Sequence, residues 1–308
     1  MVILILIPIL IGSGLAIQTA VNSKLREYVG SPYMASTISF TIGALFLIVL
    51  TLLSSVDPLI PMDTFAHNPW WIWIGGVLGV IALTVNLLLF PRLGSIQTAV
   101  LPLFGQIIMG LIIDQFGLFY APKSGLTLVK FLSALLVSIG MLMSTGMIGK
   151  HLTGDNNNNL SFQLIGIGSG LLMASQAAIN GHLGIVLKSS THAAMISFLV
   201  GAILLWILII ILRVPVKQTK VAVQAGKKYW WIWIGGFLGA AYVFGVAWLV
   251  PQIGTGQVVV ITLFGQLLFS TLIDQFGLFQ SFVNKVSVIR IIGLVVMFIG
   301  VAGIHFLK

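Results

Sequence analysis

Long apolar segments separated by short polar connections run through the whole chain. About 20 apolar residues are needed to cross roughly 30 Å of hydrocarbon, so each such segment predicts a membrane-spanning helix. We place ten of them, near residues 2–22, 33–55, 70–90, 95–113, 128–148, 161–180, 191–212, 230–250, 255–273 and 287–307. The first lacks the basic start and small-residue cleavage site of a secretory signal peptide, and we keep it as a span. The pattern predicts an all-α membrane protein with ten transmembrane helices.

The second half of the chain repeats the first. At an offset of 160, about half of positions 70–119 are identical to 230–279. The repeated segments are Trp-Trp-Ile-Trp-Ile-Gly-Gly (70–76 and 230–236), Leu-Phe-Gly-Gln (103–106 and 263–266) and Asp-Gln-Phe-Gly-Leu-Phe (114–119 and 274–279). We therefore divide the chain into a first five-helix repeat at 1–149, a linker at 150–160 and a second five-helix repeat at 161–308.

Five spans in each half is an odd number, which has a consequence for topology. A chain that enters the first half from one side of the membrane must enter the second half from the other side. Two inverted halves are a recurring way to build secondary transporters, because they can exchange conformations around one site at the midplane. The alternative is that duplication only enlarged a helical bundle.

The ten spans, the inverted halves and the paired Leu-Phe-Gly-Gln and Asp-Gln-Phe-Gly segments resemble the drug/metabolite transporter (DMT) superfamily. The resemblance covers the whole chain and is to the fused, two-half form of the YdcZ-type inner-membrane exporters. It implies export across a bacterial inner membrane by a multi-pass protein, with four helices of each half lining the path and the fifth at the periphery. Small multidrug-resistance relatives carry a buried glutamate in their first helix, whereas Glu27 here lies beyond the first span.

Composition removes most other function classes. Apolar residues make up 58% of the chain and charged residues 7%, against about a quarter charged in soluble domains. The net charge of +9 comes from cations scattered through connections, and a nucleic-acid surface would cluster them. The absence of cysteine excludes disulfides and thiolate chemistry. We find no catalytic group, metal ligand set, cofactor motif or nucleotide-binding loop, and expect a protein that is not an enzyme.

The cations also predict orientation. Connections after odd-numbered spans hold eleven Lys and Arg residues, against four on the opposite side. Five of the eleven lie in the connection at 213–229. By the positive-inside rule this connection should be cytoplasmic and both termini should face out.

Polar side chains within the spans are candidates for substrate binding, because amides are costly in hydrocarbon unless they face a bundle interior or water. Two pairs spaced i and i+4 each occupy one helix face, and two further glutamines lie about 16 Å along their spans, at the midplane. The candidates are Gln18, Asn22, Gln106, Gln176, Asn180 and Gln266. The alternative is that these amides only hold helices together.

Asp114 and Asp274 are duplicated acids near span ends, each followed by Gln-Phe-Gly. A carboxylate is unfavourable at a helix C-terminus because the helix dipole is negative there. That leaves room for a role in ion coupling. The alternative is that each aspartate simply ends its span, with Gly117 or Gly277 as the terminating residue.

Glycines and tryptophans in the repeats have structural interpretations. We expect close helix approach at Gly75 and Gly79, at their counterparts Gly235 and Gly239, and at Gly12, Gly14, Gly168 and Gly170. The tryptophans at 70–73 and 230–233 are expected to form interfacial belts.

Together these features predict a secondary transporter, an exporter of a small organic metabolite or amphiphile that works by alternating access. The direction of transport rests on the resemblance alone. The expected partners are a small-molecule substrate and the lipid bilayer, without nucleic acid, for a monomer or a homodimer. A passive channel or scramblase and a non-transporting membrane partner protein are the alternatives.

Overall fold

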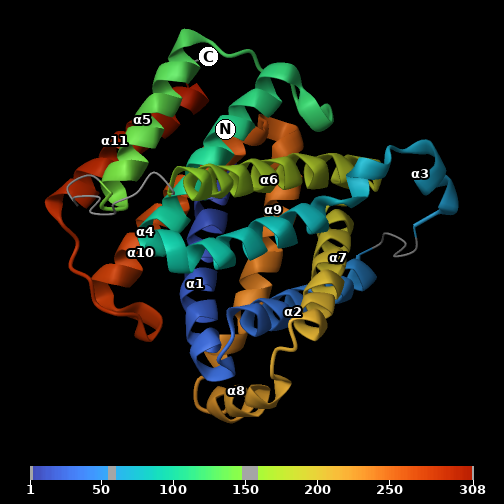
Figure 1. Ribbon diagram of the computed structural model, residues 1–308. Helices are drawn as coiled ribbons and strands as arrows, with labels where there is room; N and C mark the ends of the chain where they lie inside the picture. The colour runs from blue at the N-terminus through green and yellow to red at the C-terminus, as the bar shows by residue number, and fades with distance from the viewer. Residues whose placement is uncertain (1–2, 55–59, 148–158, 307–308) are drawn as a thin grey trace.

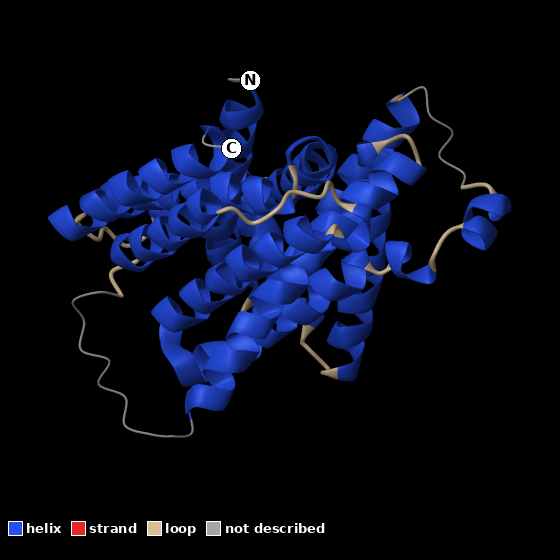
Figure 2. Cartoon of the chain, turned by 90° about the horizontal axis from the view of Figure 1, so that it is seen from above, coloured by secondary structure: helices blue, strands red, loops and turns tan. Residues whose placement is uncertain are grey.

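The computed structural model of the chain describes residues 3–54, 60–147 and 159–306, so most of the predicted linker lies outside the described residues. Within these ranges every regular element is a helix and none is a strand (Figure 2). The long helices are α1 (Ile3–Val29), α2 (Pro32–Leu53), α4 (Gly75–Phe116), α5 (Leu128–Ser144), α6 (Asn159–Val186), α7 (Ser190–Ile211), α9 (Gly235–Ile253), α10 (Thr255–Phe276) and α11 (Val288–Phe306). The predicted all-α class is confirmed.

Nine segments of the described chain are long and apolar enough to cross a membrane. Two of them are arms of α4: a first arm, Gly75–Gly94, and a second arm, Gln97–Phe116. The fifth predicted span corresponds to α5, which is apolar but only 17 residues long. The chain is therefore a multi-span helical membrane protein.

A glycine separates the two arms of α4. Gly94 has φ 72° and ψ 176°, a region of backbone space that is essentially restricted to glycine. Its counterpart Gly254 has φ 87° and ψ 159° and separates α9 from α10. The same sharp reversal therefore follows the third span of each half.

Two of the longer connections contain short helices that the hydrophobic pattern did not predict. They are α3 (Met62–His67) and α8 (Thr219–Gly226), in equivalent places in the two halves. Ala222 of α8 is fully buried, while the lysines around it stay exposed. Because α8 is short and buries only this one residue, its sequence lacks a long apolar stretch and resembles that of a loop.

Each half packs against the other through its first helix. α1 packs against α9 and α10 of the second half, and α6 packs against both arms of α4 in the first half. α5 and α11 lie side by side at the edge of the bundle (Figure 1). Their outer faces expose apolar side chains such as Leu135 and Val295, as expected for helices that meet lipid.

Close backbone contact fixes the two main crossings between the halves. A Cβ at Gly12 of α1 would overlap the carbonyl oxygen of Thr262 in α10, and a Cβ at Gly170 of α6 would overlap that of Pro102 in α4. The predicted close approach at these glycines is confirmed. Gly14 is less crowded, and no described atom lies within 4 Å of a Cβ at Gly168, so the prediction was wrong at Gly168.

Candidate functional site

The asparagines of α1 and α6 make the same contacts in the two halves. Asn22 donates from Nδ2 to Ser39 Oγ at 3.2 Å, and its amide oxygen lies against Gly235 at the start of α9. Asn180 donates to Ser197 Oγ at 3.2 Å, and its amide oxygen lies against Gly75 at the start of α4. Each asparagine therefore joins two helices of its own half and touches the third span of the other half. Such close contacts require small residues, and the sequence supplies serine and glycine.

One helical turn away, the glutamines of α1 and α6 also face the opposite half. The side chain of Gln18 packs against Gly239 of α9, and that of Gln176 packs against Gly79 of α4. Both glutamines are half-buried. The structure thus places each predicted i, i+4 pair on one face, and that face is turned toward the other half of the protein.

The remaining two glutamines lie at the helix crossings. Gln106 is 4% exposed and donates from Nε2 to the sulfur of Met173 at 3.7 Å. Gln266 is half-buried, and its backbone lies beside Gly12 of α1. All six predicted amides therefore lie on α1, α6, α10 or the second arm of α4, the helices through which the halves meet.

Several of these amides have acceptors left over. Within the described residues, the buried oxygens Gln18 Oε1, Asn22 Oδ1 and Asn180 Oδ1 accept no hydrogen bond from the protein. Buried polar atoms are normally paired, because leaving one unpaired costs free energy. Three unpaired amide oxygens on the faces between the halves are consistent with a site for a molecule that donates hydrogen bonds.

The Asp-Gln-Phe-Gly segments build the connections that follow their spans. The backbone oxygen of Asp114 accepts from Ser124 N at 2.7 Å, and that of Asp274 accepts from Asn284 N at 2.8 Å. The next side chains, Gln115 and Gln275, accept the backbone N–H of the residue eleven positions later. Each segment therefore folds its connection back onto the end of its helix.

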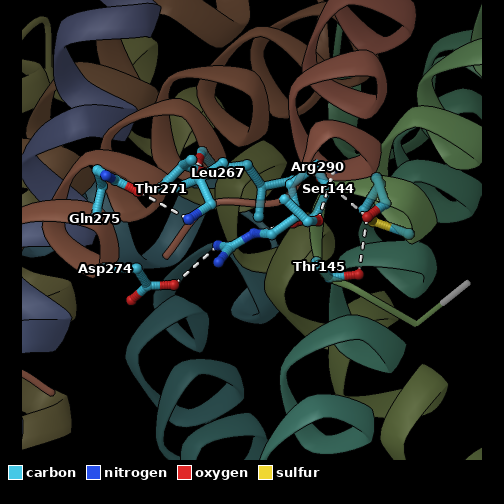
Figure 3. A network of polar contacts seen from close by, with 10 residues as sticks. Ser144, Thr145, Leu267, Thr271, Asp274, Gln275 and Arg290 are labelled. Carbon is cyan, nitrogen blue, oxygen red and sulfur yellow. Dashed lines mark hydrogen bonds and ion pairs between the residues drawn. The ribbon is translucent and has the colours of Figure 1, made fainter. Parts of the chain in front are cut away.

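The terminating role predicted for Gly117 and Gly277 is confirmed, because both adopt left-handed conformations at helix ends, with φ 66° and 60°. The carboxylates of the two segments differ. Asp114 is buried and accepts the backbone N–H groups of Thr255 at 2.7 Å and Gly256 at 2.9 Å. Asp274 instead pairs with Arg290 at 2.8 Å (Figure 3).

The tryptophan segments are divided between surface and interior. Trp70 and Trp230 are 73% and 70% exposed, which fits the predicted interfacial belts. Trp71 turns inward and packs on the rings of Tyr120 and His182, with ring centroids 5.8 Å and 5.6 Å away. These rings close on one another, so they form packing at the end of the helix bundle.

Some residues of the site were not among the sequence predictions. Ser39 and Ser197 stand at equivalent positions of the two halves, 158 residues apart, and they orient the asparagines. Lys130 and Arg290 stand at equivalent positions as well, 160 residues apart, and their basic side chains lie beside the two aspartates. The sequence signal that could have identified these two residues is a basic residue at the same position of each repeat, 16 residues after a duplicated aspartate.

Comparison with known proteins agrees with this architecture. A crystal structure of another protein matches 97% of this chain and 96% of its own, with a TM-score of 0.70 and 16% sequence identity. That likeness concerns the fold alone. No curated protein matches the chain.

The sequence profile of one family matches two segments, residues 3–143 and 161–303, which together take up nearly the whole chain. The family is described as "Putative inner membrane exporter, YdcZ", which is the description of a transport protein. The two matches also coincide with the two halves of the internal repeat. The chain belongs to the YdcZ family of the DMT superfamily, as a fused two-half, multi-pass protein of the inner membrane.

Proposed function

We propose that the protein is a secondary transporter that exports a small organic metabolite or amphiphile by alternating access. In this proposal ten spans form two inverted five-helix halves, at residues 1–149 and 161–308, joined by the linker at 150–160. α5 serves as the fifth span despite its length, because it pairs with α11 at the edge of the bundle. Membership of an exporter family supports the transport class and the direction.

The exchanged packing of the halves is the observation that carries the proposal. Asn22 touches Gly235 and Asn180 touches Gly75, so each half presents the same surface to the other. Two such units can move relative to one another and arrive at an equivalent contact on the opposite side. Matching contacts of this kind follow from a two-fold relation between the halves, which is the relation that alternating access uses.

The substrate is proposed to bind between the halves, on Gln18, Asn22, Gln106, Gln176, Asn180 and Gln266. Three amide oxygens there have no donor within the described protein. Those of Asn22 and Asn180 lie against Gly235 and Gly75, so they would accept hydrogen bonds from N–H or O–H groups of the substrate once the halves move apart. None of the six side chains carries a charge. A neutral or zwitterionic solute with hydrogen-bond donors therefore fits better than a permanent cation.

A transport assay with purified protein tests this function. Thermal stabilisation by a panel of small solutes would first identify a ligand, since a molecule that binds only the folded state raises its melting temperature. In liposomes, that solute should then show saturable uptake and counterflow. Flux without counterflow would indicate a channel or scramblase, and no flux would indicate a partner protein.

A further prediction concerns orientation. The connection that contains α8 carries five cations and should be cytoplasmic. Gln224 is exposed on α8, whereas Ala222 is buried and would be a poor reporter. In this cysteine-free chain, Gln224→Cys should react with a membrane-impermeant maleimide only after the cells are permeabilised. Labelling in intact cells would show that this connection faces out and that the predicted orientation is wrong.

A further inference from the structure

The two aspartates of the Asp-Gln-Phe-Gly segments hold equivalent positions but different partners. Asp114 reaches across to the second half, where its two carboxylate oxygens accept the first two N–H groups of α10. Asp274 stays within its own half and contacts Arg290. Its side chain is 33% exposed, whereas Asp114 is 7% exposed. Identical sequence segments thus occupy two distinct states in one molecule.

The glycines at the two helix reversals also differ in how closely the opposite half covers them. At Gly254, a Cβ would lie 2.9 Å from Asp114 Oδ2. At Gly94, no described atom lies within 4 Å of a Cβ, and the residue is exposed. Gly254 is therefore covered by the opposite half, while Gly94 itself is exposed. The opposite half still reaches the helix beyond Gly94, because Gln163 of α6 donates to Gln97 Oε1 at 3.3 Å.

The basic residue that follows each aspartate supplies an alternative partner. Arg290 binds Asp274 and also donates from Nε to the backbone oxygen of Ser144 at 2.9 Å, as Figure 3 shows. Its counterpart Lys130 lines a cavity of about 10 Å³ together with Asp114 and Gln257. There the lysine donates instead to Ser124 Oγ at 2.5 Å. Lys130 is thus placed to receive Asp114 if the carboxylate leaves α10.

We propose that Asp114 and Asp274 are alternating latches, each of which closes one end of the transport path by capping the helix that follows the glycine reversal of the opposite half. Asp114 is latched on α10, so its end is closed. Asp274 is released onto Arg290, so the other end is open. In the opposite state, Asp114 would move to Lys130, and Asp274 would cap the helix start that follows Gly94. The latch proposal rests on the proposed transport function.

Physical chemistry favours such a switch. The first N–H groups of a helix lack partners within the helix, and the dipole is positive there, so a carboxylate binds well. The C-terminal end of its own helix is the opposite environment, which leaves each aspartate dependent on an outside partner. A helix start or a neighbouring cation can each fill that need. Because the competing partners lie in different halves, the choice is coupled to how the halves are arranged.

Cysteine labelling of purified, full-length protein in lipid nanodiscs tests the latches. Gln257 lies just inside α10 at the closed end, and Gln97 is its counterpart at the open end, so Gln257→Cys and Gln97→Cys serve as matched reporters. Asp114→Ala removes two hydrogen bonds to a charged acceptor and should speed maleimide labelling of the first reporter about tenfold or more, with slower labelling of the second. Asp274→Ala weakens the opposite state and should change the two rates in the reverse directions.

Lys130→Gln provides a variant that leaves the observed cap in place and is expected to fold even if Asp114→Ala does not. It removes the alternative partner of Asp114, so labelling of Gln257→Cys should become slower than in the parent. Aspartate variants that leave both rates unchanged, or that move them in the same direction, would reduce the aspartates to fixed helix caps. If the aspartate variants change the labelling rates but the protein shows no counterflow in liposomes, the transport proposal is wrong and the latch proposal stands. If counterflow occurs but the labelling rates do not change, the latch proposal is wrong and the transport proposal stands.

Discussion

Replacing Gly12 or Gly170 by alanine should destabilise the folded protein by about 1–3 kcal/mol, the usual cost of overpacking. Each new Cβ would overlap a backbone carbonyl oxygen of the crossing helix, at Thr262 or Pro102. A backbone cannot rotate away as a side chain can, so the helices must separate. Thermal unfolding of each purified variant in detergent should show a clearly lowered melting temperature.

Gly168→Ala is the matched control, because it makes the same change on α6 where no described atom lies within 4 Å of the new Cβ. Alanine is also the better helix former, so this variant should be as stable as the parent or slightly more stable. Equal melting temperatures for the Gly170 and Gly168 variants would show that the close crossing between α6 and α4 does not support the fold.

Gln106→Leu or Gln266→Leu should weaken substrate binding about tenfold or more. Both glutamines lie where the halves cross, and a lost hydrogen bond to a buried ligand group costs about 1–3 kcal/mol. Leucine has a similar size and suits an apolar surrounding, so the folded protein should persist. Affinity for a solute found by thermal stabilisation, measured beside the melting temperature of the free protein, separates the two effects.

Gln252→Leu is a suitable control for this pair. Gln252 is exposed near the end of α9 and donates to the backbone of its own helix, at Trp248 O. Its loss should leave affinity unchanged. If the Gln106 and Gln266 variants also kept the parent's affinity, these glutamines would serve only to hold helices together, and the substrate would bind elsewhere.

Hydrophobic pattern and repetition were enough to predict the class of fold. Each long apolar segment became a helix, since bilayer thickness sets the length that a span needs. The Gly-Gly that begins α9 and the glycine of Leu-Phe-Gly-Gln were repeated because the same crossings occur twice. α3 and α8 were missed because α3 buries no residue and α8 buries only Ala222, so neither has the long apolar stretch that predicts a helix.

The partners of the site residues could not be predicted in the same way. Asn22 and Gly235 are far apart in sequence, and neither residue carries a feature from which their contact could be predicted. The two aspartates show a more basic limit. Asp114 and Asp274 stand in identical segments, so sequence assigns them one role, while the structure places them in two states. The two aspartates have different partners because the two halves are packed asymmetrically, which an identical segment of sequence cannot reveal.

The side of the membrane on which Trp70 and Trp230 lie tests the central claim, that the protein works through two inverted halves. Both residues are equivalent in the repeat and largely exposed. In the cysteine-free chain, Trp70→Cys should react with an impermeant maleimide in intact cells, and Trp230→Cys should react only after permeabilisation. Labelling of both cysteines from the same side would contradict the inversion and remove the basis for alternating access.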